Sequence, residues 1–382
     1  MTDHPRPPRP PSVDRRTVLK AFAAAGVAAA MPGALRATSP QDSKPAAAKK
    51  KILVLGGTNQ LGPKFVEAAL ARGHEITLFN RGKTNPHLFP ELEKLRGDRR
   101  KGELDALKGD RRWDVVVDTS AYVPRVVRQV SEILKGRVDA YVMISSISVY
   151  PRADGEDTDE STPVGVLEDP NTEKVMENYG PLKAACEAEA EKWFPGKTVN
   201  LRPGLIVGDG DESNRFGYWP LRVAAGGEVL APIGPEQTIQ WIDVKDLAAF
   251  MVKALEEGIY GVYNAVGPAV PFGTLLPACR KAAKSDAEFT YVSLDFLQAE
   301  KVRPWQDIPC WVPPAEGKSK CPVSSGAKAA AKGMTFRPVE DTVADQLAFE
   351  RARPADDRFK GGLSRERETE LLAKWKQRSA PK

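Results

Sequence analysis

The chain has 382 residues, of which 41% are hydrophobic and 28% are charged, so a soluble globular protein with one large core or two moderate ones is expected. Its formal net charge is only +5, and basic residues alternate with acidic ones, which argues against nucleic acid as a partner. Three histidines and four cysteines without a metal-ligand spacing argue against a metal site, a histidine-dependent triad and a disulfide framework.

The first 37 residues have the composition of an export signal. A proline-rich leader ends at Arg15 and Arg16, and residues 21–31 form a short apolar stretch. Eleven apolar residues are too few to span a bilayer but have the length of a signal h-region. The arginine pair resembles a twin-arginine signal, which passes proteins that are already folded. We therefore expect residues 1–37 to be a signal peptide, with a disordered tail as the alternative.

Residues 38–50 read as a linker, and a regular alternation of strands and helices begins at residue 51. An apolar run at 52–55 is followed by glycines, a helical periodicity at 65–70 and a second strand at 74–80. The pattern continues with strands at 113–120 and 139–146 around a helix at 123–136, and two more short apolar strands bounded by glycine are expected at 198–208 and 261–267. Strands that alternate with helices predict an α/β fold with a Rossmann-type, doubly wound parallel sheet.

The pattern also predicts how the chain is divided. Residues 51–205 form the dinucleotide-binding domain, which strands within 238–267 complete. Residues 206–237 and 268–345 are rich in Gly, Pro and Trp and are expected to form a smaller substrate lobe over the carboxyl ends of the strands. Cys310 and Cys321 lie in this lobe, and free thiols are favoured over a disulfide between them. Residues 346–382 are interpreted as a charged, solvated helical tail.

The turn after the first strand is a candidate phosphate-binding loop. It carries Gly56, Gly57 and Gly62 between an apolar strand and an amphipathic helix. Glycines there let the backbone approach a pyrophosphate, which the N–H groups of the following helix can bind. Asn59 stands where a third glycine is usual, and Asn can adopt the left-handed conformation. The predicted cofactor-binding residues of this loop are Gly56, Gly57, Thr58, Asn59, Gln60, Leu61 and Gly62.

The end of the second strand bears on the choice between NAD and NADP. An acidic residue there usually binds the ribose 2′-hydroxyl of NAD, whereas this chain has Asn80 and Arg81. An arginine can pair with a 2′-phosphate, which favours NADP over NAD. Asp98 is a candidate for contact with the adenine edge, with a plain turn residue as the alternative.

Tyr179 and Lys183 are candidates for proton transfer. They are four residues apart in a predicted helix and therefore share one face. A nearby cation is expected to lower the pKa of the phenol, which could then take a proton from an alcohol as hydride leaves the same carbon. Lys183 is also expected to bind the nicotinamide ribose. Ser145 and Ser146 end a predicted strand at the same edge of the sheet.

Six motifs resemble those of one family, the extended and atypical short-chain dehydrogenase/reductases, also called the NAD-dependent epimerase/dehydratase family. They are "VLGGTNQLG", "ISSISVY", "NYGPLK", "LRPGLIVG", "WIDVKDLA" and "VYNAVG", in that order. The resemblance implies that Ser146 is the catalytic serine, Tyr179 the acid/base and Lys183 its partner. It also implies a nicotinamide cofactor and a small-molecule substrate, commonly a sugar derivative.

The export signal and the family resemblance together predict a type of reaction. A dinucleotide made in the cytoplasm must be bound before export and cannot be exchanged afterwards, so an epimerase or dehydratase that returns its hydride fits an exported, periplasmic or extracytoplasmic protein without a membrane span. A cytoplasmic reductase with net cofactor turnover is the first alternative. A non-catalytic dinucleotide- or RNA-binding protein is the second. A homodimer is considered as its assembly.

Two features bear on the substrate. Residues 152–178 carry nine acidic against two basic residues, a poor neighbour for a diphosphate, so a free or polymer-derived sugar is as well supported as a nucleotide sugar. Aromatic side chains of the smaller lobe could form a floor for sugar stacking, with core packing as the alternative. These side chains are Phe216, Tyr218, Trp219, Trp305 and Trp311.

Overall fold

The computed structural model describes residues 48–151, 156–319, 321–358 and 360–379. All of them belong to one compact unit, Ala47–Lys382. The expected signal peptide at 1–37, and most of the expected linker at 38–50, lie outside the described residues.

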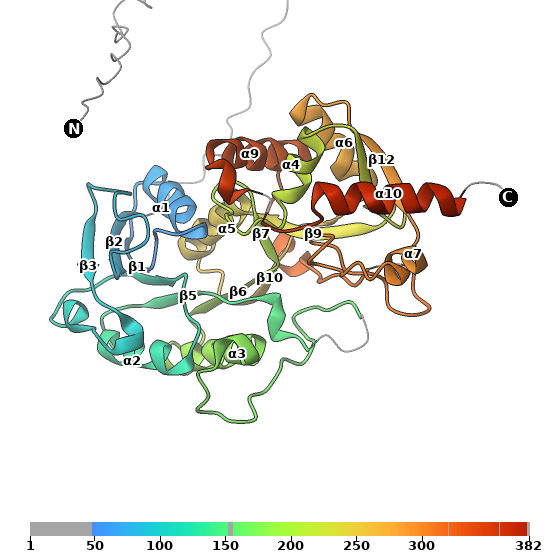
Figure 1. Cartoon of the computed structure of the whole chain (residues 1–382). Coiled ribbons are helices and arrows are strands. Elements are labelled where there is room, and N and C mark those ends of the chain that lie inside the picture. Colours follow the sequence, from blue (N-terminus) through green and yellow to red (C-terminus); the bar gives the residue numbers. More distant parts are fainter. Residues whose placement is uncertain (1–47, 152–155, 320, 359, 380–382) are drawn as a thin grey trace, which may run out of the picture. The chain divides into compact units, whose positions relative to one another are not determined.

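A parallel sheet of seven strands forms the centre of this unit (Figure 1). In spatial order the strands are β10 (Gly261–Ala265), β6 (Thr198–Pro203), β5 (Ala140–Ile144), β4 (Val115–Asp118), β1 (Lys51–Leu55), β2 (Glu75–Asn80) and β3 (Glu93–Arg96). The central strands are apolar along their length because both faces of the sheet are covered. This confirms the predicted Rossmann-type α/β fold.

Helices cover both faces of the central sheet (Figure 1). On one face, α1 (Leu61–Ala71) packs beside α5 (Val244–Glu257), and their apolar side chains share a core with β1, β4 and β5. On the other face, α2 (Pro124–Leu134) packs beside α3 (Val175–Trp193). Because the seven strands are parallel, they all end at the same edge of the sheet, and the loops that follow them converge there.

A second hydrophobic core holds the smaller lobe. Its strands form a sheet of β7 (Leu205–Val207), β9 (Thr238–Asp243) and β11 (Ala269–Pro271) and a parallel pair of β8 (Glu228–Pro232) and β12 (Glu288–Val292). Its helices are α4 (Tyr218–Ala224), α6 (Phe272–Ala283), α7 (Leu294–Ala299), α9 (Val339–Ala352) and α10 (Arg365–Ser379). The short helix α8 (Ala327–Ala331) instead packs against β10 and buries Ala329 in the core of the central sheet. Short 3₁₀ turns are η2 (Arg99–Lys101), η3 (Asp105–Leu107), η4 (Ile147–Val149) and η5 (Ala355–Asp357).

Two expectations about the smaller lobe need correction. The segment 198–208 reads as one apolar strand, but the chain leaves the central sheet after Pro203 and β7 joins the smaller sheet. The charged tail is not simply solvated: α10 buries Leu371 and Leu372 in the second core, and its Glu368 pairs with Arg222 at 2.5 Å, both side chains being fully buried.

The four cysteines are buried free thiols, so Cys310 and Cys321 are unpaired in the structure. Among the described residues, no helix is long and apolar enough to cross a membrane.

Candidate functional site

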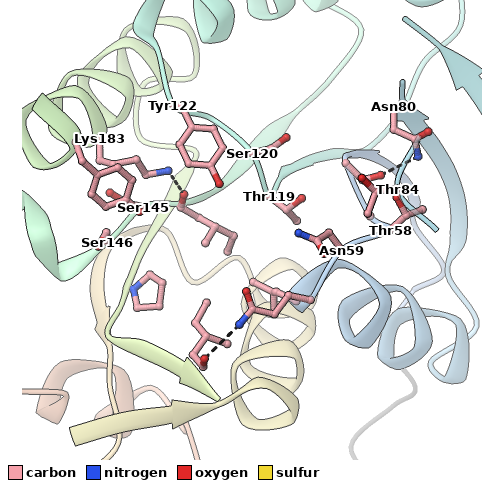
Figure 2. Close-up of a pocket in the computed structure, with 18 of the residues that line it drawn as sticks. Thr58, Asn59, Asn80, Thr84, Thr119, Ser120, Tyr122, Ser145, Ser146 and Lys183 are labelled. Carbon is pink, nitrogen blue, oxygen red and sulfur yellow. Dashed lines mark hydrogen bonds between the residues drawn. The ribbon is translucent and has the colours of Figure 1, made fainter. Parts of the chain in front are cut away.

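A cavity of about 770 Å³ lies at the carboxyl ends of the central strands. The loops after β1, β2, β4 and β5 line it, together with the start of α3 and residues of the smaller lobe. Figure 2 shows Thr58 and Asn59 of the glycine loop across the cavity from Ser145, Ser146 and Lys183. The structure thus brings the predicted phosphate-binding loop and the predicted proton-transfer residues to the same cavity.

The glycine loop lies so close to neighbouring atoms that two of its glycines leave no room for a side chain. Gly56 has a φ of 111°, and a Cβ there would lie 2.4 Å from Thr119 Oγ1. A Cβ on Gly62 would lie 2.6 Å from the backbone carbon of Gly57. Asn59 does not take the positive φ that the sequence allows it; Gln60 does, with φ 42°, and its amide donates to the Ile206 carbonyl at 3.2 Å.

The start of α1 meets the requirements of a phosphate site. The helix begins at Leu61 with no side-chain cap and no acidic residue in its first turn. Its first N–H groups and the positive end of its dipole therefore face the cavity without a competing anion. Thr58, Asn59, Gln60 and Leu61 all line the cavity. These residues fit a dinucleotide pyrophosphate.

The end of β2 is more constrained than expected. Asn80 donates through Nδ2 to the Gly56 carbonyl at 3.0 Å, and its Oδ1 accepts from the Gly82 N–H and from Arg96. Its side chain therefore fastens the glycine loop to β2 rather than remaining free for a ligand. Arg81 is exposed and lines the cavity, as does Lys83.

Asp98 acts as a turn residue in the structure. Its Oδ1 accepts from the Arg100 N–H at 3.0 Å and caps η2, although the residue also lines the cavity. The neighbouring Arg99 is buried and pairs with Asp118 at the end of β4, with Nη1 2.6 Å from Oδ2. Despite the burial of both groups, this pairing holds the pKa of Asp118 below its ordinary value. The ion pair anchors the 97–101 loop to the sheet edge.

The position of Tyr179 depends on a close approach between α3 and η4. A Cβ on Gly180 would lie 1.9 Å from the Ser148 carbonyl oxygen, so only glycine fits there. The helix is kinked at Asn178, where φ is −125°, and Pro181 therefore falls in the first turn after the kink. These features place Tyr179 against Ser146.

The pKa of Tyr179 is raised, not lowered as the sequence led us to expect. Burial raises it, and a hydrogen bond with Ser146 opposes the rise. Lys183 is buried, and its Nζ donates to the carbonyls of Ala121 at 2.6 Å and Ile144 at 2.5 Å (Figure 2). The ammonium thus holds two strand-end loops together, and burial lowers the pKa of Lys183.

Several lining residues were not found from the sequence. Thr119 and Ser120 follow β4 at the same sheet edge, which was the available signal for them. Tyr122 stands beside Lys183, whose Nζ is 5.3 Å from the Tyr122 ring centroid (Figure 2). The centroids of the Tyr122 and Tyr179 rings are 6.4 Å apart. Ser145, by contrast, was placed at this edge from the sequence; its Oγ is buried beside the cavity and has no hydrogen-bond partner among the described residues.

The proposed aromatic floor is reduced to one residue. Four of the five side chains are at most 3% exposed and belong to the second core, as the alternative interpretation held; they are Phe216, Tyr218, Trp219 and Trp311. Trp305 is 40% exposed and lines the cavity.

A parallel sheet, an uncapped helix after a glycine turn and a Tyr–Lys helix at the same edge are the features of a Rossmann-type dinucleotide-binding protein. The sequence profile of the NAD dependent epimerase/dehydratase family matches residues 52–265. The chain belongs to this family.

Relatives and solved structures agree with that assignment. The chain is 26% identical to bovine "Epimerase family protein SDR39U1" over 239 residues, which are 57% of this chain and 75% of that protein. It is 29% identical over 262 residues to "Chloroplast stem-loop binding protein of 41 kDa b" of Arabidopsis thaliana, covering 62% of this chain and 64% of the relative.

The fold is similar to that of a putative epimerase from Burkholderia cenocepacia J2315, with a TM-score of 0.58 at 20% identity, covering 81% of this chain and all of the other. It is also similar to UDP-glucuronic acid 4-epimerase from Bacillus cereus in complex with NAD, with a TM-score of 0.57 at 18% identity, covering 78% of this chain and 98% of the other. At these identities the likeness concerns the fold.

Proposed function

We propose that the protein is a nicotinamide-dependent enzyme of the epimerase/dehydratase type that acts on a sugar or sugar derivative and leaves its cofactor unchanged after each cycle. One observation carries this proposal: Ser146, Tyr179 and Lys183 converge on the same cavity as the uncapped start of α1. A phosphate site and a proton-transfer site in one cavity fit chemistry at a carbinol carbon beside a dinucleotide.

Each residue has a distinct role in this proposal. Tyr179 takes the hydroxyl proton of the substrate and later returns it, and Ser146 orients the reacting oxygen through its hydroxyl. Lys183 holds the loops after β4 and β5 through its two carbonyl contacts. A nicotinamide ring, when bound, accepts a hydride from the substrate carbon and gives it back.

The choice of cofactor rests on the charges at the adenosine end. Arg81, Lys83 and Arg100 all line that part of the cavity, whereas Asp98 is the acidic residue among the lining side chains. Three cations beside the end of β2 favour a 2′-phosphate, so we propose NADP over NAD.

Export completes the proposal. We propose that the protein leaves the cytoplasm by a route for folded proteins and carries its dinucleotide with it, and that it works as a homodimer. The reaction is then an epimerisation or a dehydration, because neither consumes the cofactor. A cytoplasmic reductase would instead need free exchange of oxidised and reduced cofactor.

Native mass spectrometry of the purified exported protein tests the proposal, since one spectrum gives the bound dinucleotide, its phosphate count and the subunit number. We expect one dinucleotide per subunit.

Incubation with free and nucleotide-linked sugars should yield a product isomeric with its substrate or lighter by one water, without net change in cofactor absorbance. Tyr179→Phe should retain the dinucleotide and form no product; a protein without dinucleotide contradicts the proposal.

A second candidate, a non-catalytic nucleic-acid-binding protein, is favoured by the relative named as a stem-loop binding protein. The cationic lining of the cavity is compatible with a phosphate backbone. A gel-shift assay with an RNA stem-loop tests it: tight, salt-sensitive binding that Tyr179→Phe leaves unchanged, with no turnover of any sugar, would favour this candidate over the enzyme.

A further inference from the structure

We propose that Arg215 and Trp305 form a subsite for a sugar that carries an acidic group, either a carboxylate or a phosphate. This inference rests on the proposed function, because it assigns the substrate of the same cavity. Both residues come from the smaller lobe, outside the central sheet, and both line the cavity with Tyr179.

The guanidinium of Arg215 has no ion-pair partner in the part of the chain that the structure describes. Its Nε atom is buried and makes no hydrogen bond, and none of the ion pairs among the described residues involves its guanidinium. A partly buried guanidinium that lacks a counter-charge has given up hydration without compensation. A carboxylate or phosphate in the cavity would supply two parallel hydrogen bonds to it.

The neighbouring acid does not neutralise Arg215. Asp211 is 2% exposed; its Oδ1 accepts from the Ser213 N–H at 3.0 Å, and its Oδ2 has no partner among the described residues. Burial raises the pKa of Asp211, which favours its neutral form, although the charge of Arg215 opposes that rise. The charge of Arg215 also reaches Tyr179, where it acts to lower the pKa of the phenol. Arg215 therefore lies within electrostatic reach of the reacting hydroxyl.

The other cations of the cavity are already assigned. Arg99 is paired with Asp118, and Lys183 donates to two carbonyls. Arg81, Lys83 and Arg100 lie in loops after β2 and β3, at the dinucleotide end. Arg215 is left as the cation that the smaller lobe brings to the cavity.

Trp305 supplies the apolar surface of the subsite. It is 40% exposed and adopts a φ of 67°, a conformation that costs energy for a bulky residue. The loop is nevertheless fastened: the Trp305 N–H donates to the Trp311 carbonyl at 3.1 Å, and the Gly362 N–H donates to the Gln306 carbonyl at 3.0 Å. An indole held in this way at a cavity wall can pack against the apolar face of a sugar ring.

The acidic stretch at 152–178 is no objection to an anionic substrate. It had favoured a neutral sugar, but none of its described residues lines the cavity. Arg215 is the cation left for the substrate, and Asp98, the acidic lining residue, lies at the dinucleotide end, which favours an acidic sugar over a neutral one.

Calorimetric titration of the full chain with its cofactor tests the subsite. The probes are D-glucuronate for the carboxylate, UDP for the phosphate and D-glucose as the neutral control. We expect one acidic probe to bind roughly tenfold or more tightly than glucose, and Arg215→Gln to remove that advantage. Arg215→Lys should restore part of it, because the charge returns without the paired donors. Arg112→Gln, the same change at an exposed site near the start of β4, should have no effect.

The pattern of losses identifies the ligand. If Arg215→Gln weakens the binding of glucuronate alone, the ligand group is a carboxylate. If it weakens the binding of UDP alone, the ligand group is a phosphate. Trp305→Leu should weaken the binding of glucuronate and of glucose to a similar extent if the indole stacks on the sugar ring. The inference is overturned if Arg215→Gln binds both acidic probes as the wild type does, or if the wild type prefers neither to glucose. Native mass spectra of the same samples report the dinucleotide, so failure of the subsite is distinguished from failure of the proposed function.

Discussion

The environment of Tyr179 sets its protonation state. Its phenol is largely buried, and burial disfavours the charged phenolate more than Ser146 and Arg215 favour it. Because its pKa lies above the ordinary value, Tyr179 carries its proton at neutral pH. To take the hydroxyl proton of the substrate, Tyr179 must first lose its own proton, so its action as a base becomes easier as the pH rises.

We predict that this phenol titrates above pH 10 in the protein purified without added cofactor. The measurement is the ultraviolet absorbance of phenolate as a function of pH, taken as the difference between the wild type and Tyr179→Phe. Circular dichroism of both proteins across the same range is the control for unfolding. A difference signal that titrates below pH 10 would show instead that Lys183 lowers the pKa, as the sequence alone suggests.

A second prediction concerns Gly180. We expect Gly180→Ala to destabilise the protein by about 1–3 kcal/mol, although alanine favours helices, because its Cβ would meet the rigid Ser148 carbonyl. The shift of α3 should also lower turnover by moving Tyr179 away from Ser146. Denaturant unfolding and product formation measure the two effects.

Gly196→Ala is the matched control for that change. Gly196 follows α3 with a φ of 68° and open space around it, so alanine there costs backbone strain of about 1–2 kcal/mol without touching the site. It should lower stability and leave turnover intact. Equal loss of turnover in both variants would refute the role given to the α3–η4 contact.

At the scale of elements, α5 carries an acid that makes stability depend on pH. Asp246 lies in the first turn of α5 and is 8% exposed; burial and the nearby Asp243 raise its pKa to about 6, although the Arg337 N–H donates to it at 2.9 Å. Because the folded state holds the proton more tightly than the unfolded state, the stabilisation is complete below about pH 4 and is lost as the pH rises through 6.

We predict that this group alone lowers the free energy of unfolding by about 2–3 kcal/mol between pH 4 and pH 7. Asp246→Asn removes the titration and keeps an oxygen for the Arg337 N–H, so its free energy of unfolding should fall less over this range. Urea unfolding at several pH values measures the difference between variant and wild type. Parallel pH profiles for the two proteins would contradict the prediction.

Local sequence patterns predicted the central elements because each pattern reports the burial of its own segment. Leu53 and Val54 lie in a short apolar run, and Tyr179 and Lys183 share a helical face. Parallel strands end at one edge, so the glycine loop, Ser146 and Tyr179 could be placed together. β3 was missed because Glu93–Arg96 carries three charged residues in four and has no apolar alternation.

The smaller lobe was less predictable because its contacts join distant segments. Nothing local to residue 215 or 305 shows that both line the cavity of the central sheet. The pairing of Arg222 with Glu368, which turns a charged tail into part of a core, joins residues 146 positions apart. The pKa of Tyr179 was likewise misjudged because the burial that raises it is produced by distant segments and is not visible in the local sequence.

At the scale of the whole molecule, the proposed export would require cofactor binding to come first. The cavity is formed by loops from both halves of the chain, since the glycine loop, Tyr179 and Trp305 all line it. A cavity complete for both the dinucleotide and the substrate therefore forms only when the complete chain has folded. If binding takes place in the cytoplasm, the exporter must accept a folded protein.

We predict that replacing Arg15 and Arg16 with lysine keeps the protein in the cytoplasm, with its dinucleotide still bound. Recognition as a twin-arginine signal is expected to require both guanidinium groups, whereas neither arginine is among the described residues that line the cavity. Fractionation of cells locates the protein, and native mass spectrometry of each fraction reports the bound dinucleotide. The matched control replaces Arg6 and Arg9, which lie in the same leader ahead of the pair, with lysine and should leave export unchanged. Two outcomes would contradict the prediction: export of the Arg15→Lys, Arg16→Lys protein, or wild-type protein found outside the cytoplasm without dinucleotide. Either outcome would show that folding around the cofactor does not precede transport. The argument for a redox-neutral reaction would then lose its basis.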